Sequence, residues 1–91
     1  MLPSQKLTLL RQEVEKIDKM LITQLIKRFQ KTAKIQQLKK QLGLPLTQKK
    51  REQALLQKHF SRARKGKLQG SLIKRLFNLI FSYSKKTGIM K

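Results

Sequence analysis

Residues 5–42 read QKLTLLRQEVEKIDKMLITQLIKRFQKTAKIQQLKKQL, and this stretch decides the fold. Apolar residues recur in it at steps of three and four, a spacing that places them on one face of an α-helix. They are Leu7, Leu10, Val14, Ile17 and Leu21, and the same face resumes at Ile35, Leu38 and Leu42. Ser4 is a suitable N-cap, and Gly43 followed by Pro45 ends the pattern. We therefore predict one helix over about residues 5–42.

A helix of this length is too long to be covered within a compact chain of 91 residues. At the usual rise per residue it spans ~57 Å, whereas a compact chain of this size has a radius of gyration of only roughly 12 Å. Two shorter helices cannot cover such a rod, but a second copy lying alongside can. Small chains also have difficulty burying a core alone. We therefore expect an intertwined homodimer.

The remainder of the chain predicts two shorter helices. One covers about residues 48–65 after Thr47 as a possible N-cap, and the other covers about residues 71–87 with Ser71 as its candidate cap. Their apolar residues follow helical spacing and are Leu55, Leu56, Phe60 and Ala63, then Leu72, Ile73, Leu76, Phe77 and Ile80. No strand alternation, internal repeat or linker interrupts them. We predict an all-α fold of three helices in a single domain over residues 1–91.

Composition narrows the setting in which the protein works. The chain has no cysteine, which excludes disulfides and thiolate metal sites. Its first residues do not form a basic segment followed by an apolar one, and no run of 18 apolar residues occurs. We expect a cytoplasmic protein without a membrane segment.

The formal charge of +19 permits two interpretations. A strongly basic surface attracts polyanions such as nucleic acid or an acidic membrane. Alternatively, a general bias toward lysine covers solvated helix faces with charge and has no functional meaning. The basic residues are spread along the chain, and no aromatic residues alternate with them to stack on bases. We favour the second interpretation and expect no specific nucleic-acid partner.

Several polar residues interrupt the apolar pattern of the long helix. Arg28 lies seven residues after Leu21, at a position where the pattern calls for an apolar residue, and Lys39 lies three turns further on the same face. A cation at such a position is energetically costly unless it is paired or binds an anion. Alternatively, the methylene chain of the residue packs against apolar neighbours while its charged group reaches water. Arg11 is seventeen residues before Arg28 and ~25 Å away along the axis. It cannot reach the same pocket within one straight helix, but it can reach the pocket of an antiparallel partner.

The two shorter helices add further polar residues at inward positions. Glu52, next to Arg51, is the only carboxylate after residue 18, and Ser84 falls on the apolar stripe that ends at Ile80. Each has a simple structural explanation when taken alone, such as a surface charge or a serine bonded to its own helix. Together with Arg28 they suit a small substrate with two carboxylates and a hydroxyl, since arginine binds carboxylates in bidentate geometry.

In this arrangement the chain resembles the all-helical, type II chorismate mutase family. The resemblance covers nearly the whole chain without a gap. It rests on Leu10-Arg11, Ile17-Asp18, Arg28, Lys39, Pro45, Arg51-Glu52-x-x-Leu55-Leu56 and Leu72-Ile73-x-x-Leu76-Phe77-x-x-Ile80-x-x-x-Ser84. Each motif is unspecific alone, and their joint order and spacing carry the comparison. The family fold has three helices, and two chains entwine through their long first helices.

The resemblance implies an enzyme that rearranges chorismate to prephenate, without cofactor or metal, in aromatic amino acid biosynthesis. Arg28 and Arg51 would hold the substrate carboxylates, and Arg11 would reach in from the other subunit. Lys39 would donate to the ether oxygen of the breaking bond. Glu52 would accept from the ring hydroxyl, and Ser84 would add a polar contact. Asp18 also matches the family pattern and is interpreted as structural.

The chain departs from the family pattern at two positions. The family usually has Gln or Glu four residues after the serine of the third helix, as a second donor to the ether oxygen, but this chain has Gly88. We expect reduced activity, with Lys39 acting alone or with partial substitution by Lys85 or Lys86. Gln48 stands where an acidic residue is common near the ring hydroxyl, and its contact can be made through the backbone.

Three alternative functions remain open at this stage. Elimination of pyruvate from isochorismate would use the same fold and the same cations. A basic helical protein that binds nucleic acid or another anionic surface would use the +19 charge. An inactive dimeric protein that has kept only the fold would bind no small molecule.

Overall fold

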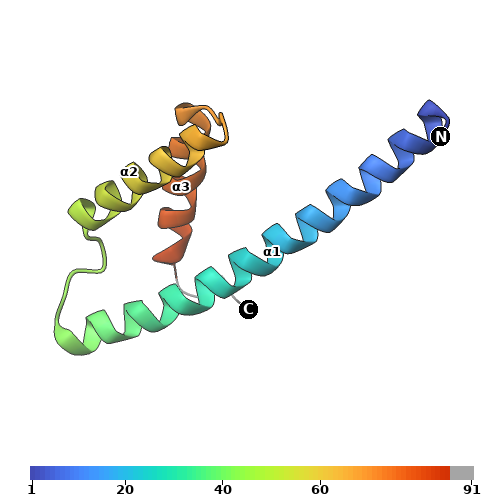
Figure 1. Cartoon of the computed structure of the whole chain (residues 1–91). Helices are drawn as coiled ribbons and strands as arrows, with labels where there is room; N and C mark the ends of the chain where they lie inside the picture. Colours follow the sequence, from blue (N-terminus) through green and yellow to red (C-terminus); the bar gives the residue numbers. More distant parts are fainter. Residues whose placement is uncertain (87–91) are drawn as a thin grey trace.

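The computed structural model describes residues 1–86 and contains three helices in this order: α1 (Pro3–Leu42), α2 (Lys49–Lys65) and α3 (Gly70–Ser84). No strand occurs in these residues. The all-helical class with three helices is therefore confirmed. Figure 1 shows α2 and α3 as a pair of neighbouring helices on one side of the second half of α1.

The ends of α1 are set by backbone geometry and, at its start, by the Gln5 side chain, whose Oε1 accepts a hydrogen bond of 3.1 Å from the Leu2 N–H. The predicted cap at Ser4 is wrong, because Leu2 is the N-cap and Pro3 is the first helical residue. Proline suits this position because its fixed φ matches the helix. An N–H at this position would have no partner within the helix, so its absence in proline costs nothing. At the other end Gly43 has φ 69°, and its N–H bonds to the carbonyl oxygens of the last turn. This left-handed conformation favours glycine and ends the helix where the sequence predicts.

The shorter helices also begin at residues other than the predicted caps. Gln48 precedes α2 in place of Thr47, and Gln69 precedes α3 in place of Ser71. Neither makes a side-chain hydrogen bond to its helix. A cap contributes only ~1 kcal/mol, so a tight connection can override it. The third helix ends at Ser84, before the predicted end at residue 87.

The core of the chain lies between α2 and α3. These two helices pack along their length, α3 meets α1 only locally, and α1 and α2 do not pack against each other. The buried apolar residues are Ala63, Ile73, Ile80 and Phe81. Next to them, the ring of His59 stacks on Phe77 with 4.0 Å between centroids. α1 contributes no buried residue, so the space between α1 and α2 is left for a cavity.

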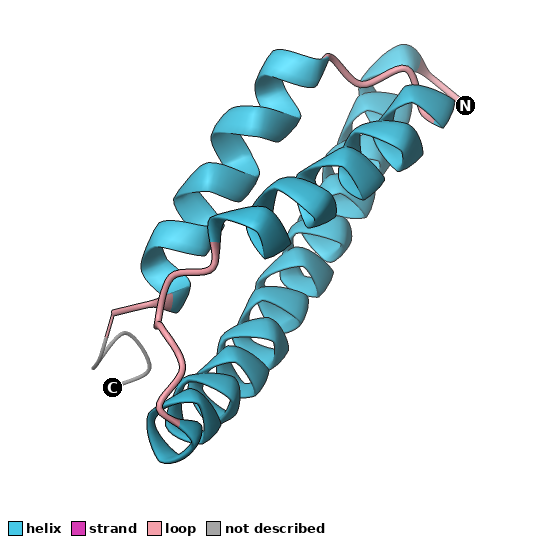
Figure 2. Cartoon of the chain, turned by 90° about the vertical axis from the view of Figure 1, so that its left-hand side faces the viewer, coloured by secondary structure: helices cyan, strands magenta, loops and turns pink. Residues whose placement is uncertain are grey.

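The first half of α1 projects beyond the rest of the chain in Figure 1 and runs away from the viewer in Figure 2. The described part measures 61 × 31 × 15 Å, and its radius of gyration is 17.3 Å, well above the roughly 12 Å expected for a compact chain of this length. The apolar seam on this projecting half is between 48% and 58% exposed at Leu7, Leu10, Val14, Ile17 and Leu21. A single chain therefore leaves this seam uncovered. None of the three helices is long and apolar enough to cross a membrane.

Candidate functional site

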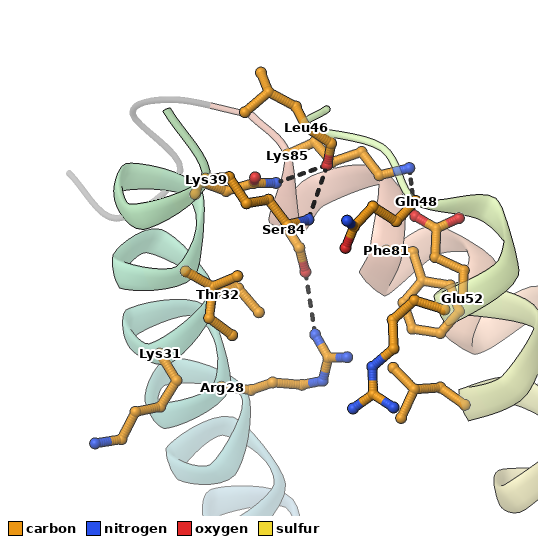
Figure 3. A pocket seen from close by; sticks show the side chains of 14 residues that line it. Arg28, Lys31, Thr32, Lys39, Leu46, Gln48, Glu52, Phe81, Ser84 and Lys85 are labelled. Atoms are coloured by element: carbon orange, nitrogen blue, oxygen red, sulfur yellow. Dashed lines mark hydrogen bonds and ion pairs between the residues drawn. The ribbon is translucent and has the colours of Figure 1, made fainter. Parts of the chain in front are cut away.

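A cavity of about 430 Å³ lies between the second half of α1, the connection before α2, the first turns of α2 and the end of α3 (Figure 3). Most of its lining surface is apolar, and cationic and polar side chains lie among the apolar ones. The lining residues are Arg28, Lys31, Thr32, Ile35, Gln36, Lys39, Leu46, Gln48, Arg51, Glu52, Leu55, Phe81, Ser84 and Lys85. Residues from all three helices and from the connection between α1 and α2 therefore meet at one place.

The wall formed by α1 follows from helical periodicity. Arg28, Thr32, Ile35 and Lys39 are separated by steps of four, three and four, so they share one face. All four line the cavity. Lys31 contributes only its methylene chain to the cavity wall, because its ammonium points away from the cavity in Figure 3.

Arg28 is fixed by contacts with α3. Its Nη1 donates a hydrogen bond of 3.1 Å to the Ser84 hydroxyl, and the guanidinium lies 5.6 Å from the centroid of the Phe81 ring. Ser84 in turn donates to the carbonyl oxygen of Ile80 at 2.7 Å, the bond to its own helix that the sequence suggested. Burial lowers the pKa of Arg28, but an arginine still remains charged. The guanidinium keeps further N–H groups that can bind an anion.

Lys39 is held by the connection that follows α1. Its Nζ donates to the carbonyl oxygen of Leu46 at 3.2 Å, and the amide of Gln36 approaches the same oxygen at 3.5 Å. The other atom of that amide, Gln36 Oε1, is buried without a hydrogen-bond partner. The Leu46 carbonyl therefore orients the ammonium of Lys39 at the cavity, and the ammonium has hydrogens left for a ligand.

On the opposite wall, Glu52 forms an ion pair with Lys85. The Lys85 Nζ and Glu52 Oε1 are 2.5 Å apart, and the two side chains are 28% and 27% exposed. Among the described residues, Glu52 is the only carboxylate that lines the cavity, against the cations of Arg28, Lys39, Arg51 and Lys85. This excess of positive charge favours a small ligand that carries more than one negative charge.

The structure brings together six of the seven predicted site residues, namely Arg28, Lys39, Gln48, Arg51, Glu52 and Ser84. Arg11 does not join them. It lies exposed on the projecting half of α1, ~25 Å from Arg28 along the helix axis. Gly88 lies outside the described residues.

Sequence reasoning missed several residues of the cavity. Gln36 lies one turn from both Thr32 and Lys39, so helical spacing could have found it. Leu46 acts through its backbone carbonyl, for which the sequence gives no side-chain signal. Lys85 was considered only as a substitute donor, and its pairing with Glu52 depends on how α3 ends beside α2. Among residues 1–86, no three His, Cys, Asp or Glu side chains are grouped to hold a metal ion.

The fold and the cavity define a three-helix protein whose cavity carries more cationic than anionic side chains. The family model for chorismate mutase type II matches residues 10–88, which is most of the chain. The protein therefore belongs to the chorismate mutase type II family, as the resemblance predicted. No curated protein and no solved structure matches the chain.

Proposed function

We propose that the protein is a chorismate mutase that converts chorismate to prephenate, a step in aromatic amino acid biosynthesis. The observation that carries this proposal is the single cavity in which Arg28, Lys39, Arg51, Glu52 and Ser84 meet, in a chain of the matching family. Chorismate has two carboxylates, one hydroxyl and an ether oxygen. The cavity offers cations for the carboxylates, an acceptor for the hydroxyl and an ammonium for the ether oxygen.

Binding in this proposal restricts the shape of the substrate. Arg28 and Arg51 hold the two carboxylates, so that the flexible enolpyruvyl side chain lies over the ring. Ser84 keeps Arg28 in place and adds a polar contact, and Gln48 contacts the ring hydroxyl region through its backbone. Holding the reacting atoms in this conformer can contribute up to ~7–11 kcal/mol in well-oriented reactions.

Lys39 stabilises the charge that develops during the reaction. The C–O bond breaks ahead of C–C bond formation, so negative charge grows on the ether oxygen. An ammonium that the Leu46 carbonyl already orients stabilises this transition state more than the ground state. Loss of one such donor typically costs ~2.7–4 kcal/mol. Glu52 accepts the hydrogen bond from the ring hydroxyl.

The proposal includes an antiparallel homodimer. The seam from Leu7 to Leu21 is exposed in the single chain, and a second α1 packed against it would cover it. In that arrangement the projecting half of one α1 passes the cavity of the other subunit. Arg11, which is too far from its own cavity, would then complete the partner's site.

The test is chorismate consumption by the purified protein with identification of the product. We expect prephenate, and we expect Arg28→Ala and Lys39→Ala to lose nearly all turnover. Lys34→Ala is the matched control, since it removes an exposed cation of α1 that does not line the cavity. Pyruvate release from isochorismate without prephenate would assign the protein to the lyase reaction instead. A folded protein that neither binds nor converts these substrates would refute the proposal.

Mixing two inactive variants tests the contribution of Arg11. In a heterodimer of Arg11→Ala and Lys39→Ala chains, one site keeps both residues and the other site loses both. Exchange of subunits should therefore restore up to about one quarter of the activity. Absence of recovery after proven exchange would show that Arg11 does not act across the dimer.

The effect of Gly88 on activity is tested by introducing a side chain that the family usually has at this position. If the missing donor limits the reaction, Gly88→Gln should raise turnover of chorismate. Unchanged or lower turnover would contradict the expectation that the missing donor at position 88 reduces activity.

A further inference from the structure

Lys85 connects two walls of the cavity that are far apart in the sequence. It follows directly after α3, and its ammonium reaches Glu52 in the first turn of α2 (Figure 3). Both residues line the cavity. The neighbouring Lys86 does not line it, and its ammonium lies 4.2 Å from the centroid of the Tyr83 ring. Of the two adjacent cations, only Lys85 therefore contacts the site.

The ion pair fixes a carboxylate that has several competing partners. Glu52 shares the cavity with Arg28, Lys39 and Arg51, and a free carboxylate can rotate toward any nearby cation. Lys85 binds one oxygen of Glu52, Oε1. The second oxygen remains able to accept a hydrogen bond, because each carboxylate oxygen is an acceptor.

We propose that Lys85 is a positioning residue which orients Glu52 toward the hydroxyl of the ligand, and that this pair makes the cavity select hydroxyl-bearing dianions. The inference rests on the proposed function and assigns Lys85 a role different from that of a second donor to the ether oxygen. Its ammonium is bound to Glu52, on the α2 side of the cavity, whereas Lys39 is bound to Leu46. A site built around a hydroxyl discriminates strongly against an analogue that lacks it.

The kinetic test compares chorismate with its analogue that lacks the ring hydroxyl. Lys85→Met should lower the ratio of kcat/KM for chorismate to kcat/KM for the analogue by about tenfold. The reason is that Glu52, once displaced, no longer accepts a hydrogen bond from the ring hydroxyl. Lys85→Arg should keep most of this ratio, and Lys86→Met is the matched control that leaves it unchanged. A loss of fold or of general affinity would reduce both substrates equally. An unchanged ratio in Lys85→Met would overturn the proposal.

A second measurement needs neither substrate nor turnover. The chain has three glutamates, Glu13, Glu15 and Glu52, so a carbon-13 label on the glutamate side-chain carboxyl gives a simple NMR spectrum. In Lys85→Met the Glu52 signal should move while the signals of Glu13 and Glu15 stay, and an unmoved Glu52 signal would overturn the proposal. If the unaltered protein does not convert chorismate, the proposed function fails, and this spectrum still decides whether Lys85 holds Glu52.

Discussion

The apolar seam on the first half of α1 provides the most direct test of the proposed homodimer. Leu21 is the last residue of this seam, lies near the midpoint of α1 and is 58% exposed in the single chain. We expect Leu21→Asp to dissociate the dimer. An aspartate side chain is too short to reach water from the middle of a helix pair, unlike a lysine, whose long stem allows its charge to do so.

The size of the effect follows from the exposed fraction of the side chain. Full burial of a leucine contributes about 1.5–3 kcal/mol, so covering the exposed half contributes about 1 kcal/mol, or about 2 kcal/mol for the two copies in a dimer. Removing a carboxylate from water without a partner costs several kcal/mol more. We expect the free energy of dimer association to become less favourable by at least about 4 kcal/mol, which corresponds to about a thousandfold higher dimer dissociation constant.

Sedimentation velocity over a range of protein concentrations measures the dimer dissociation constant. Thr23→Asp is the matched control, because it introduces the same charge on the same helix, two residues away on the opposite face. Circular dichroism checks that both variants remain helical. A Leu21→Asp protein that stays dimeric and helical would refute the antiparallel packing through this seam. Dissociation by both variants alike would mean that the charge acts without regard to the face of the helix.

Three further changes follow from individual contacts. Ser84→Ala removes the acceptor of the Arg28 hydrogen bond. Because this pair is only partly buried, we expect binding to lose about 1 kcal/mol, seen as about a fivefold rise in KM for chorismate. An unchanged KM would show that water replaces the hydroxyl fully. Gly43→Ala places a side chain at φ 69° in open space. Thermal unfolding should therefore show a decrease of about 1 kcal/mol in the free energy of unfolding, from backbone strain alone. An equal melting temperature would contradict this expectation. Burial, and then the charges of Arg62 and Arg28, lower the pKa of His59. The folded protein therefore binds a proton at His59 less readily than the unfolded chain does, and it loses stability as the pH falls through about 6.5. His59→Phe should therefore lose less free energy of unfolding between about pH 7 and about pH 5 in urea titrations, and an equal loss in both proteins would argue against a role for His59.

The helices were predictable because their signals are local. The spacing of Leu7, Leu10 and Val14 reports a helix face directly, and Gly43 with Pro45 marks the end of α1. The caps were less predictable, since Ser4, Thr47 and Ser71 each offer only ~1 kcal/mol. The starts of α1, α2 and α3 depend instead on Pro3 and on the short connections between the helices.

The sequence by itself determined the family, the three helices and one wall of the cavity. Arg28 and Lys39 share a face because the helical period depends only on neighbours along the chain. The tertiary structure decided which residues oppose that wall. Arg28 and Ser84 are 56 residues apart in the chain, and their contact, like the pair of Lys85 with Glu52, depends on the angle at which α3 returns from α2 toward α1. That angle is set by the packing of the α2–α3 core and by the short connection between those helices, and no local spacing in the sequence reports it.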